Sequence, residues 1–156
     1  MKDAQRTKPF NLIGLGGSFD HLHEGHHLLL STAAKLGNHI TIGLTTDEMV
    51  KHKTHRDKIQ SYEKREEILS IFLENELNLA PESFTIFPLS DPYGPTLTDA
   101  TIDAHISSEE THENAIKINK MRIERGLPPM VLIIIPYVLD SKGEIISSTR
   151  IRSEIK

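Results

Sequence analysis

Short apolar runs alternate with longer segments of helical periodicity along most of the chain. The strand-like runs are 10–15, 39–45, 84–89, 101–106 and 130–135, and the helical segments are 24–36, 47–55, 61–77, 109–125 and 147–156. Strands that alternate with helices in this way are typical of a parallel sheet. We therefore predict an α/β fold with a doubly wound, parallel five-stranded sheet and helices on both faces. Because 130–135 is continuously apolar, it is expected to be buried on both of its faces.

The length of 156 residues suits one domain with a single core. We expect 1–156 to form one domain, in which the polar stretch 1–9 is a flexible N-terminal extension. The N-terminus lacks the apolar stretch of a signal peptide, and no apolar run has the length of a membrane span, so the expected location is the cytoplasm. A net charge of −4 argues against sequence-independent binding of nucleic acid. The lack of cysteine excludes disulfides, thiol nucleophiles and zinc fingers.

The densest cluster of chemically active residues lies between the first strand and the first helix. It reads GGSFDHLHEGHH over 16–27 and holds four of the nine histidines. A phosphate bound there would meet free backbone N–H groups and the positive end of the helix dipole. His23 and His26 lie three residues apart at the helix start, so both could donate to phosphoryl oxygens. The cluster completes neither the dinucleotide-binding glycine motif nor the Walker A motif.

A zinc hydrolase is the competing interpretation of the same residues. His23-Glu24-Gly25-His26-His27 matches the H-E-x-x-H motif, in which both histidines bind zinc and the glutamate acts as general base. That motif must lie inside a helix, whereas here it straddles a junction between loop and helix and contains a glycine. His52, His55, His105 or an acid could serve as the third ligand, and the sequence assigns none of them.

Three further polar clusters follow predicted strands. Ser147, Ser148 and Thr149 begin the last helix, where Arg152 could bind the same phosphate bidentately. The SSEET segment at 107–111 is also an ordinary helix-capping sequence. Thr45 is followed by the basic segment 51–58, in which one lysine could neutralise a phosphate. Because the carboxyl ends of parallel strands share one edge, these clusters should meet there and form a site suited to phosphoryl or nucleotidyl transfer.

Two of the clusters together resemble the paired signatures of the nucleotidyltransferase superfamily, a Rossmann-like fold. Gly17-Ser18-Phe19-Asp20 followed by His23-Glu24-Gly25-His26 resembles G-[ST]-F-D…H-x-G-H, and the segment ISSTRIR at 146–152 is similar to I-S-S-T-x-x-R. Within the superfamily, the chain looks most like the archaeal and eukaryotic type of phosphopantetheine adenylyltransferase. This resemblance rests on the chain length, the Thr-Thr-Asp segment at 45–47 and the Ser-Glu-Glu-Thr segment at 108–111. That family makes dephospho-coenzyme A and diphosphate from ATP and 4′-phosphopantetheine. The chain lacks the arginine pair of the bacterial enzymes, so the bacterial hexamer is not expected.

The resemblance implies a role for each matching residue. The implied catalytic residues are His26, His23 and Lys51, with Lys53 as the second choice for the acceptor-phosphate lysine and Lys58 as a third. The implied ATP-binding residues are Gly17, Ser18, Phe19, His26, Ile146, Ser147, Ser148, Thr149 and Arg152. The implied acceptor-binding residues are Ser18, Asp20, Thr45, Lys51, Ser108, Glu109, Glu110 and Thr111.

The resemblance also implies the ligands and leaves alternatives for the acceptor. ATP and 4′-phosphopantetheine are the expected partners, with Mg²⁺ accompanying ATP and held mostly by phosphates and water rather than by a protein metal site. We expect no nucleic-acid or membrane partner, and a monomer or small homo-oligomer. The alternatives are nicotinamide mononucleotide as the acceptor, or a cytidylyltransferase that uses glycerol phosphate or choline phosphate. A non-catalytic nucleotide sensor on the same fold is a further alternative.

Overall fold

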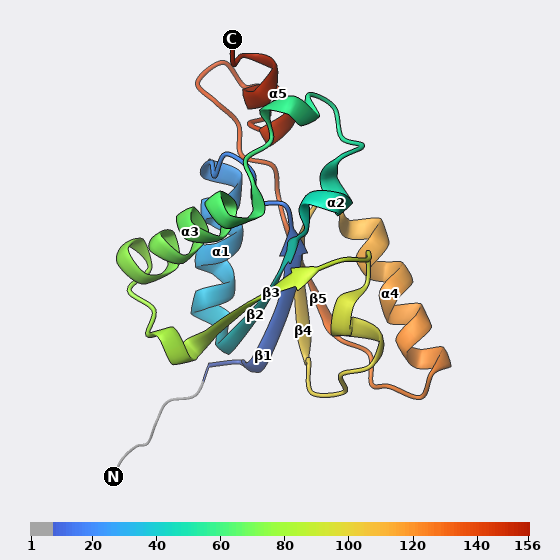
Figure 1. The fold of residues 1–156 in the computed structure, drawn as a ribbon. Coiled ribbons are helices and arrows are strands. Elements are labelled where there is room, and N and C mark those ends of the chain that lie inside the picture. The colour runs from blue at the N-terminus through green and yellow to red at the C-terminus, as the bar shows by residue number, and fades with distance from the viewer. Residues whose placement is uncertain (1–7) are drawn as a thin grey trace.

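The computed structural model describes residues 8–156. Its central element is one five-stranded parallel sheet. The strands are β1 (Phe10–Gly17), β2 (Gly37–Thr45), β3 (Phe84–Leu89), β4 (Ala104–Ser108) and β5 (Val131–Ile135). Their order across the sheet is β3-β2-β1-β4-β5, with every neighbouring pair parallel (Figure 1). The chain thus leaves the central strand β1 first toward one edge and later toward the other. The crevice at such a reversal, beyond the carboxyl ends of the strands, is where ligands bind in open α/β sheets.

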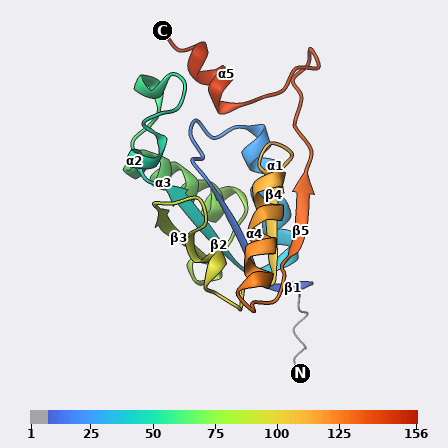
Figure 2. The ribbon, with the colours of Figure 1, turned by 90° about the vertical axis from the view of Figure 1, so that its right-hand side faces the viewer.

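Helices cover both faces of the sheet, as the sequence predicts. They are α1 (Glu24–Leu36), α2 (Asp47–Val50), α3 (Tyr62–Ile71), α4 (His112–Glu124) and α5 (Ser148–Ser153). Helices α1 and α3 lie on one face and α4 lies on the other, whereas α2 and α5 stand above the carboxyl edge (Figures 1 and 2). Among residues 8–156, no helix is long and apolar enough to cross a membrane.

The alternation of side chains along β1 divides the interior into two layers. Ile13 and Leu15 are buried in the larger core, which Leu30 of α1 and Leu69 of α3 complete. Leu12 packs on the opposite face in the smaller core beneath α4. Because the even positions of β1 beyond Leu12 are glycines, β1 contributes no side chain to this second face near its carboxyl end. The cavity described below occupies that space.

Several element boundaries differ from the prediction. The helix expected over 47–55 ends at Val50, and the following loop turns through a short 3-10 helix at Arg56–Lys58. The strand expected over 101–106 is shifted, because the Asp103 carboxylate accepts hydrogen bonds from the backbone N–H groups of Asn11 (3.0 Å) and Leu12 (2.8 Å) before β4 begins. The helix expected over 109–125 begins only at His112.

The prediction that the last strand is buried on both faces is wrong. Val131 is 52% exposed and Ile134 is 41% exposed. The reason is that β5 is an edge strand, which pairs only with β4. Residues 1–7 of the predicted extension 1–9 lie outside the described residues. Lys8, the first described residue, donates its backbone N–H to Asn38 Oδ1 at 3.2 Å.

Candidate active site

A cavity of about 640 Å³ lies at the carboxyl edge of the sheet, where the chain reverses at β1. It brings together the polar clusters that follow four separate elements. The predicted residues in its wall are Gly17, Ser18, Phe19, His23, His26, Thr45, Ser108, Glu110, Thr111, Ile146, Ser147, Ser148, Thr149 and Arg152. Asp20, Lys51 and Glu109 are not among its lining residues. Their predicted substrate contacts stay predictions.

His23 and His26 form a stacked pair at the start of α1, with ring centroids 3.8 Å apart. His23 is the N-cap residue, and its Nδ1 accepts the backbone N–H of Gly25 at 3.0 Å. His26 Nδ1 in turn accepts the backbone N–H of His23 at 3.2 Å. Because both Nδ1 atoms are acceptors, each neutral ring carries its proton on Nε2. The helix cap therefore fixes the tautomer of both imidazoles.

Both imidazoles are uncharged near neutral pH. Burial, followed by the charge of neighbouring His23, lowers the pKa of His26 to about 3. Burial and the charge of His27 lower the pKa of His23 to about 4. The pair thus offers two Nε2–H donors at the helix N-terminus without a net positive charge. Such fixed donors can stabilise negative charge that develops on a phosphoryl group.

The lowered pKa of His26 makes stability depend on pH. Between about pH 6.5 and 3 the unfolded chain binds a proton that the folded protein does not, so the free energy of unfolding falls as the pH falls. One such proton corresponds to about 1.4 kcal/mol per pH unit. We expect His26→Gln to flatten this dependence between about pH 6 and 5, in the upper half of that window, in urea unfolding. The control variant His52→Gln, in the exposed loop, should keep the wild-type slope; equal slopes in all three proteins would contradict the assignment.

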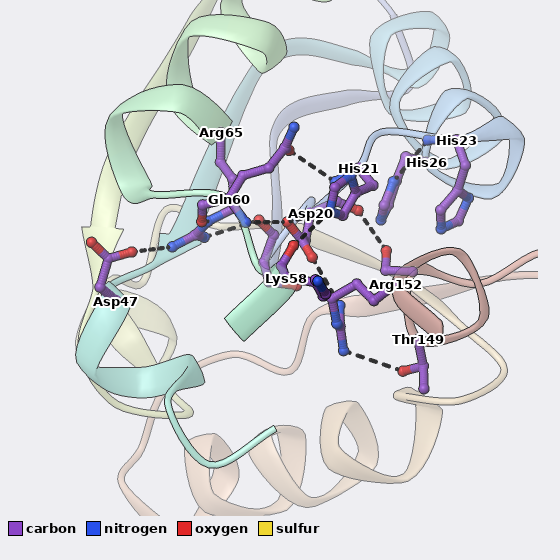
Figure 3. Close-up of polar contacts among 12 residues, drawn as sticks. Asp20, His21, His23, His26, Asp47, Lys58, Gln60, Arg65, Thr149 and Arg152 are labelled. Carbon is purple, nitrogen blue, oxygen red and sulfur yellow. Dashed lines mark hydrogen bonds and ion pairs between the residues drawn. The ribbon is translucent and has the colours of Figure 1, made fainter. Parts of the chain in front are cut away.

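A buried ion pair joins the loop after β1 to the last helix (Figure 3). Asp20 is fully buried; its Oδ2 lies 2.9 Å from Nη1 of Arg152, and its Oδ1 accepts the backbone N–H of Gln60 at 2.8 Å. Arg152 Nε also donates to the carbonyl of Thr54 at 3.2 Å. Ser148 Oγ donates to the Asp20 carbonyl at 2.6 Å. These contacts hold segments far apart in the sequence around the cavity. The resemblance assigns Asp20 to the acceptor and Arg152 to ATP, whereas here the two side chains bind each other.

Arg65 of α3 is a further positioning residue, which the sequence interpretation missed. Its fully buried guanidinium donates to the carbonyl oxygens of Ser18 (3.0 Å) and Thr45 (2.8 Å). Ser18 directly follows β1, and Thr45 is the last residue of β2. It also pairs with Asp47 at 3.0 Å (Figure 3). One signal was present in the sequence: Arg65 occupies a position on the core-facing side of the helix, four residues before Leu69.

The backbone around Asp20 is strained. Phe19 and His21 both have a φ of 48°, a left-handed conformation that non-glycine residues rarely adopt. Side-chain contacts hold it in place: His21 N–H donates to Gln60 Oε1 at 3.0 Å, and its Nε2 lies 2.8 Å from the Lys58 carbonyl. On either side of Phe19 in this turn, Ser18 lines the cavity and Asp20 is buried in the protein.

The structure separates the candidate lysines. Lys53 lines the cavity, where partial burial and the charge of Arg152 lower its pKa. Lys51 pairs instead with Glu48 and is 66% exposed. Lys58 lies 3.9 Å from Asp57 and is not in the cavity wall. The loop geometry therefore favours Lys53 as the cation that meets a bound phosphate.

The two histidines of the zinc interpretation point in different directions. His23 bonds within the helix cap, whereas the ring of His27 stacks on Phe72 at a centroid distance of 4.4 Å and bonds Glu24 at 3.2 Å. Within residues 8–156, no group of three or more His, Cys, Asp or Glu side chains could hold a metal ion. The zinc interpretation thus lacks a ligand set in this part of the chain.

The family pattern described as cytidylyltransferase-like matches residues 15–154. The chain belongs to the cytidylyltransferase-like family. It is 41% identical to the phosphopantetheine adenylyltransferase of Methanopyrus kandleri over 94% of this chain and 91% of the relative. It is 40% identical to that of Pyrococcus horikoshii over 94% of this chain and 90% of the relative.

A solved structure agrees with the family's fold. The bifunctional NMN adenylyltransferase/ADP ribose pyrophosphatase of Francisella tularensis, complexed with AMP and a manganese ion, superposes with a TM-score of 0.64. The two sequences are 12% identical, and the superposition covers 93% of this cytidylyltransferase-like chain and 41% of the Francisella protein. The predicted Rossmann-like fold and nucleotidyltransferase membership are confirmed.

Proposed function

We propose that this cytidylyltransferase-like chain transfers AMP from ATP to 4′-phosphopantetheine, giving dephospho-coenzyme A and diphosphate. One structural observation carries the proposal: His23 and His26 present neutral Nε2–H donors to the same cavity as the first turn of α5 and Lys53. Archaeal relatives about 40% identical over nearly their whole length are named for this reaction. A site of positioned donors and cations fits direct nucleotidyl transfer, because positioning and charge stabilisation can supply most of the catalysis without a covalent intermediate.

The reaction proceeds by in-line displacement at the α-phosphorus of ATP. A phosphate oxygen of the acceptor forms the new bond to phosphorus while the bond to the bridging oxygen of the diphosphate breaks. The acceptor phosphate is anionic near neutral pH, so the site needs no strong base. His26 and His23 donate Nε2–H to the oxygens of the α-phosphate, where negative charge rearranges in the transition state.

The last helix holds the diphosphate that leaves. The backbone N–H groups of Ser148 and Thr149 lie in the first turn of α5 and therefore have no partner within the helix. Ser147 Oγ accepts the Arg150 N–H at 3.1 Å and fixes this turn. Arg152 acts through its ion pair with Asp20, which sets the position of α5 over the cavity.

ATP enters as its Mg²⁺ complex in this proposal. Mg²⁺ keeps several waters and is typically bound through substrate phosphates. The cavity wall offers hydroxyls and backbone N–H groups for those phosphates, and the described residues hold no cluster of carboxylates that would bind the ion by itself. The cytoplasmic location, the single domain over 1–156 and the oligomeric state stay predictions.

Lys53 is expected to bind the acceptor phosphate. Lys53→Ala should raise the KM for 4′-phosphopantetheine about 10-fold or more, with a smaller effect on the KM for ATP, because a charge-assisted contact is lost. Lys51→Ala removes the same charge from the same loop outside the cavity wall and is the matched control. Initial rates over a range of acceptor concentrations measure both. An effect of Lys51→Ala alone would return the role to Lys51.

The identity of the acceptor is tested by analysing products. The purified protein with ATP and Mg²⁺ is offered 4′-phosphopantetheine, nicotinamide mononucleotide, glycerol phosphate or choline phosphate in separate reactions. We expect an adenylylated product, identified by mass, with 4′-phosphopantetheine at rates far above those with the others. A preference for another acceptor would overturn the choice of substrate and leave the transfer chemistry standing.

A further inference from the structure

The cavity extends below the phosphate-binding edge along the face of the sheet that α4 covers. Gly14 and Gly16 of β1 and Gly43 of β2 line this part without side chains. A Cβ atom built on Gly14 would lie 3.3 Å from Ile102 and 4.0 Å from Cδ2 of His105. The lack of a side chain at Gly14 thus leaves a narrow space between β1 and the side chains of Ile102 and His105.

His105 of β4 forms part of the wall of this deep space, opposite Gly14 in the strand register. Among the described residues, none hydrogen-bonds either of its ring nitrogens. Nδ1 is enclosed by protein and unpartnered. Nε2, in contrast, is not enclosed by protein atoms. Because the ring lines the cavity, Nε2 is the ring nitrogen that a ligand in the cavity can reach.

Ser107, two residues along the same face of β4, repeats this pattern. It is 5% exposed and lines the cavity, and its Oγ has no hydrogen-bond partner in residues 8–156. Buried polar groups in folded proteins are nearly always hydrogen-bonded, so two such groups on one strand face need an explanation. A ligand that brings its own polar groups into the deep space supplies one.

The His105 ring is neutral, and its surroundings select one tautomer. Burial lowers the pKa of His105 to about 4. Of the two neutral forms, the one with an enclosed and unpaired N–H is the less favourable, because orphaned buried donors are rarer than orphaned acceptors. The form with the proton on Nε2 is therefore favoured, and in that form the ring offers one N–H donor to the cavity.

We propose that His105 donates its Nε2–H to an amide carbonyl oxygen in the arm of the acceptor, and so selects acceptors that carry an amide chain. This inference rests on the proposed function. His105 lies three residues below Ser108 on β4, a distance of about 10 Å at the rise of a β-strand. A phosphate bound at the edge with a linear amide chain running down β4 reaches that depth. 4′-Phosphopantetheine has this form, with two amides in its chain, whereas adenine has no carbonyl oxygen.

Three proteins test the inference: the wild type, His105→Leu and His105→Gln. Leucine fills a similar volume without a donor, whereas glutamine keeps an N–H group. We expect His105→Leu to raise the KM for 4′-phosphopantetheine about 10-fold, the effect of losing one hydrogen bond, with the KM for ATP unchanged. His105→Gln should recover much of the loss. The thermal midpoint of His105→Leu should equal or exceed that of the wild type, because an unpartnered polar group is replaced by an apolar one.

The outcomes separate this inference from the proposed function. Wild-type turnover of 4′-phosphopantetheine with an unchanged acceptor KM in His105→Leu would overturn the inference alone. A raised KM for ATP instead would place the ring against the nucleotide and also overturn it. A folded wild type that binds ATP but does not use 4′-phosphopantetheine would overturn both. A lowered thermal midpoint together with an unchanged acceptor KM would show that His105 has a structural role only.

Discussion

Replacement of His26 by alanine should lower kcat about 100-fold or more, with a smaller change in the KM for either substrate. The reason is that His26 Nε2–H is a preorganised donor whose interaction strengthens as charge develops on the transferring phosphoryl group. Its Nδ1 is fixed by the backbone N–H of His23, so the donor is already aligned before substrate binds. Steady-state diphosphate release and single-turnover formation of product measure the effect.

His27→Ala is the matched control for this variant. His27 is the next residue of α1, but its ring stacks on Phe72 outside the cavity. We expect kcat of His27→Ala to stay close to the wild-type value. A normal kcat for His26→Ala with only a raised KM would mean that His26 binds ground state and transition state equally, and would contradict the assigned role.

Asp20→Ala should reduce the free energy of unfolding by about 3–5 kcal/mol, the cost of leaving one partner of a buried ion pair without compensation. Arg152 is 2% exposed, and its guanidinium would face the vacated position without a counter-charge. The backbone N–H of Gln60 would lose its acceptor as well. Urea unfolding near neutral pH measures the loss.

Two companion variants make this prediction specific. Glu48→Ala breaks the pair of exposed side chains Glu48–Lys51 and should cost less than about 1 kcal/mol. In a double-mutant cycle, the loss of unfolding free energy in the double variant Asp20→Ala/Arg152→Leu should be much smaller than the sum of the losses in the two single variants. Additive losses, or a loss below about 1 kcal/mol for Asp20→Ala, would contradict a stabilising role of the pair.

Local patterns in the sequence predicted the fold class and the place of the site. Alternating strand and helix segments specify a parallel sheet, and the shared carboxyl edge of that sheet is enough to bring the 16–27 and 146–152 segments together. The start of the helical segment 61–77 was also predicted: Ser61 caps α3, and its Oγ accepts the Lys64 N–H at 3.2 Å. These features depend on residues close to one another in the chain.

Features that depend on distant partners could not be predicted in this way. The pairing of Asp20 with Arg152 spans 132 positions, and no spacing rule connects them. The exposure of Val131 depends on strand order, which the hydrophobic pattern does not contain. The choice between Lys51 and Lys53 depends on how the loop after α2 turns. His105 was considered only as a third zinc ligand, because its neighbourhood in the cavity is created by Gly14 on another strand.

Release of diphosphate from ATP and Mg²⁺, measured with and without 4′-phosphopantetheine, tests the central claim most directly. The proposed reaction consumes both substrates in one displacement, so release should require the acceptor and should match the dephospho-coenzyme A formed in a one-to-one ratio. Folded protein that binds ATP but releases no diphosphate when 4′-phosphopantetheine is added would contradict the account.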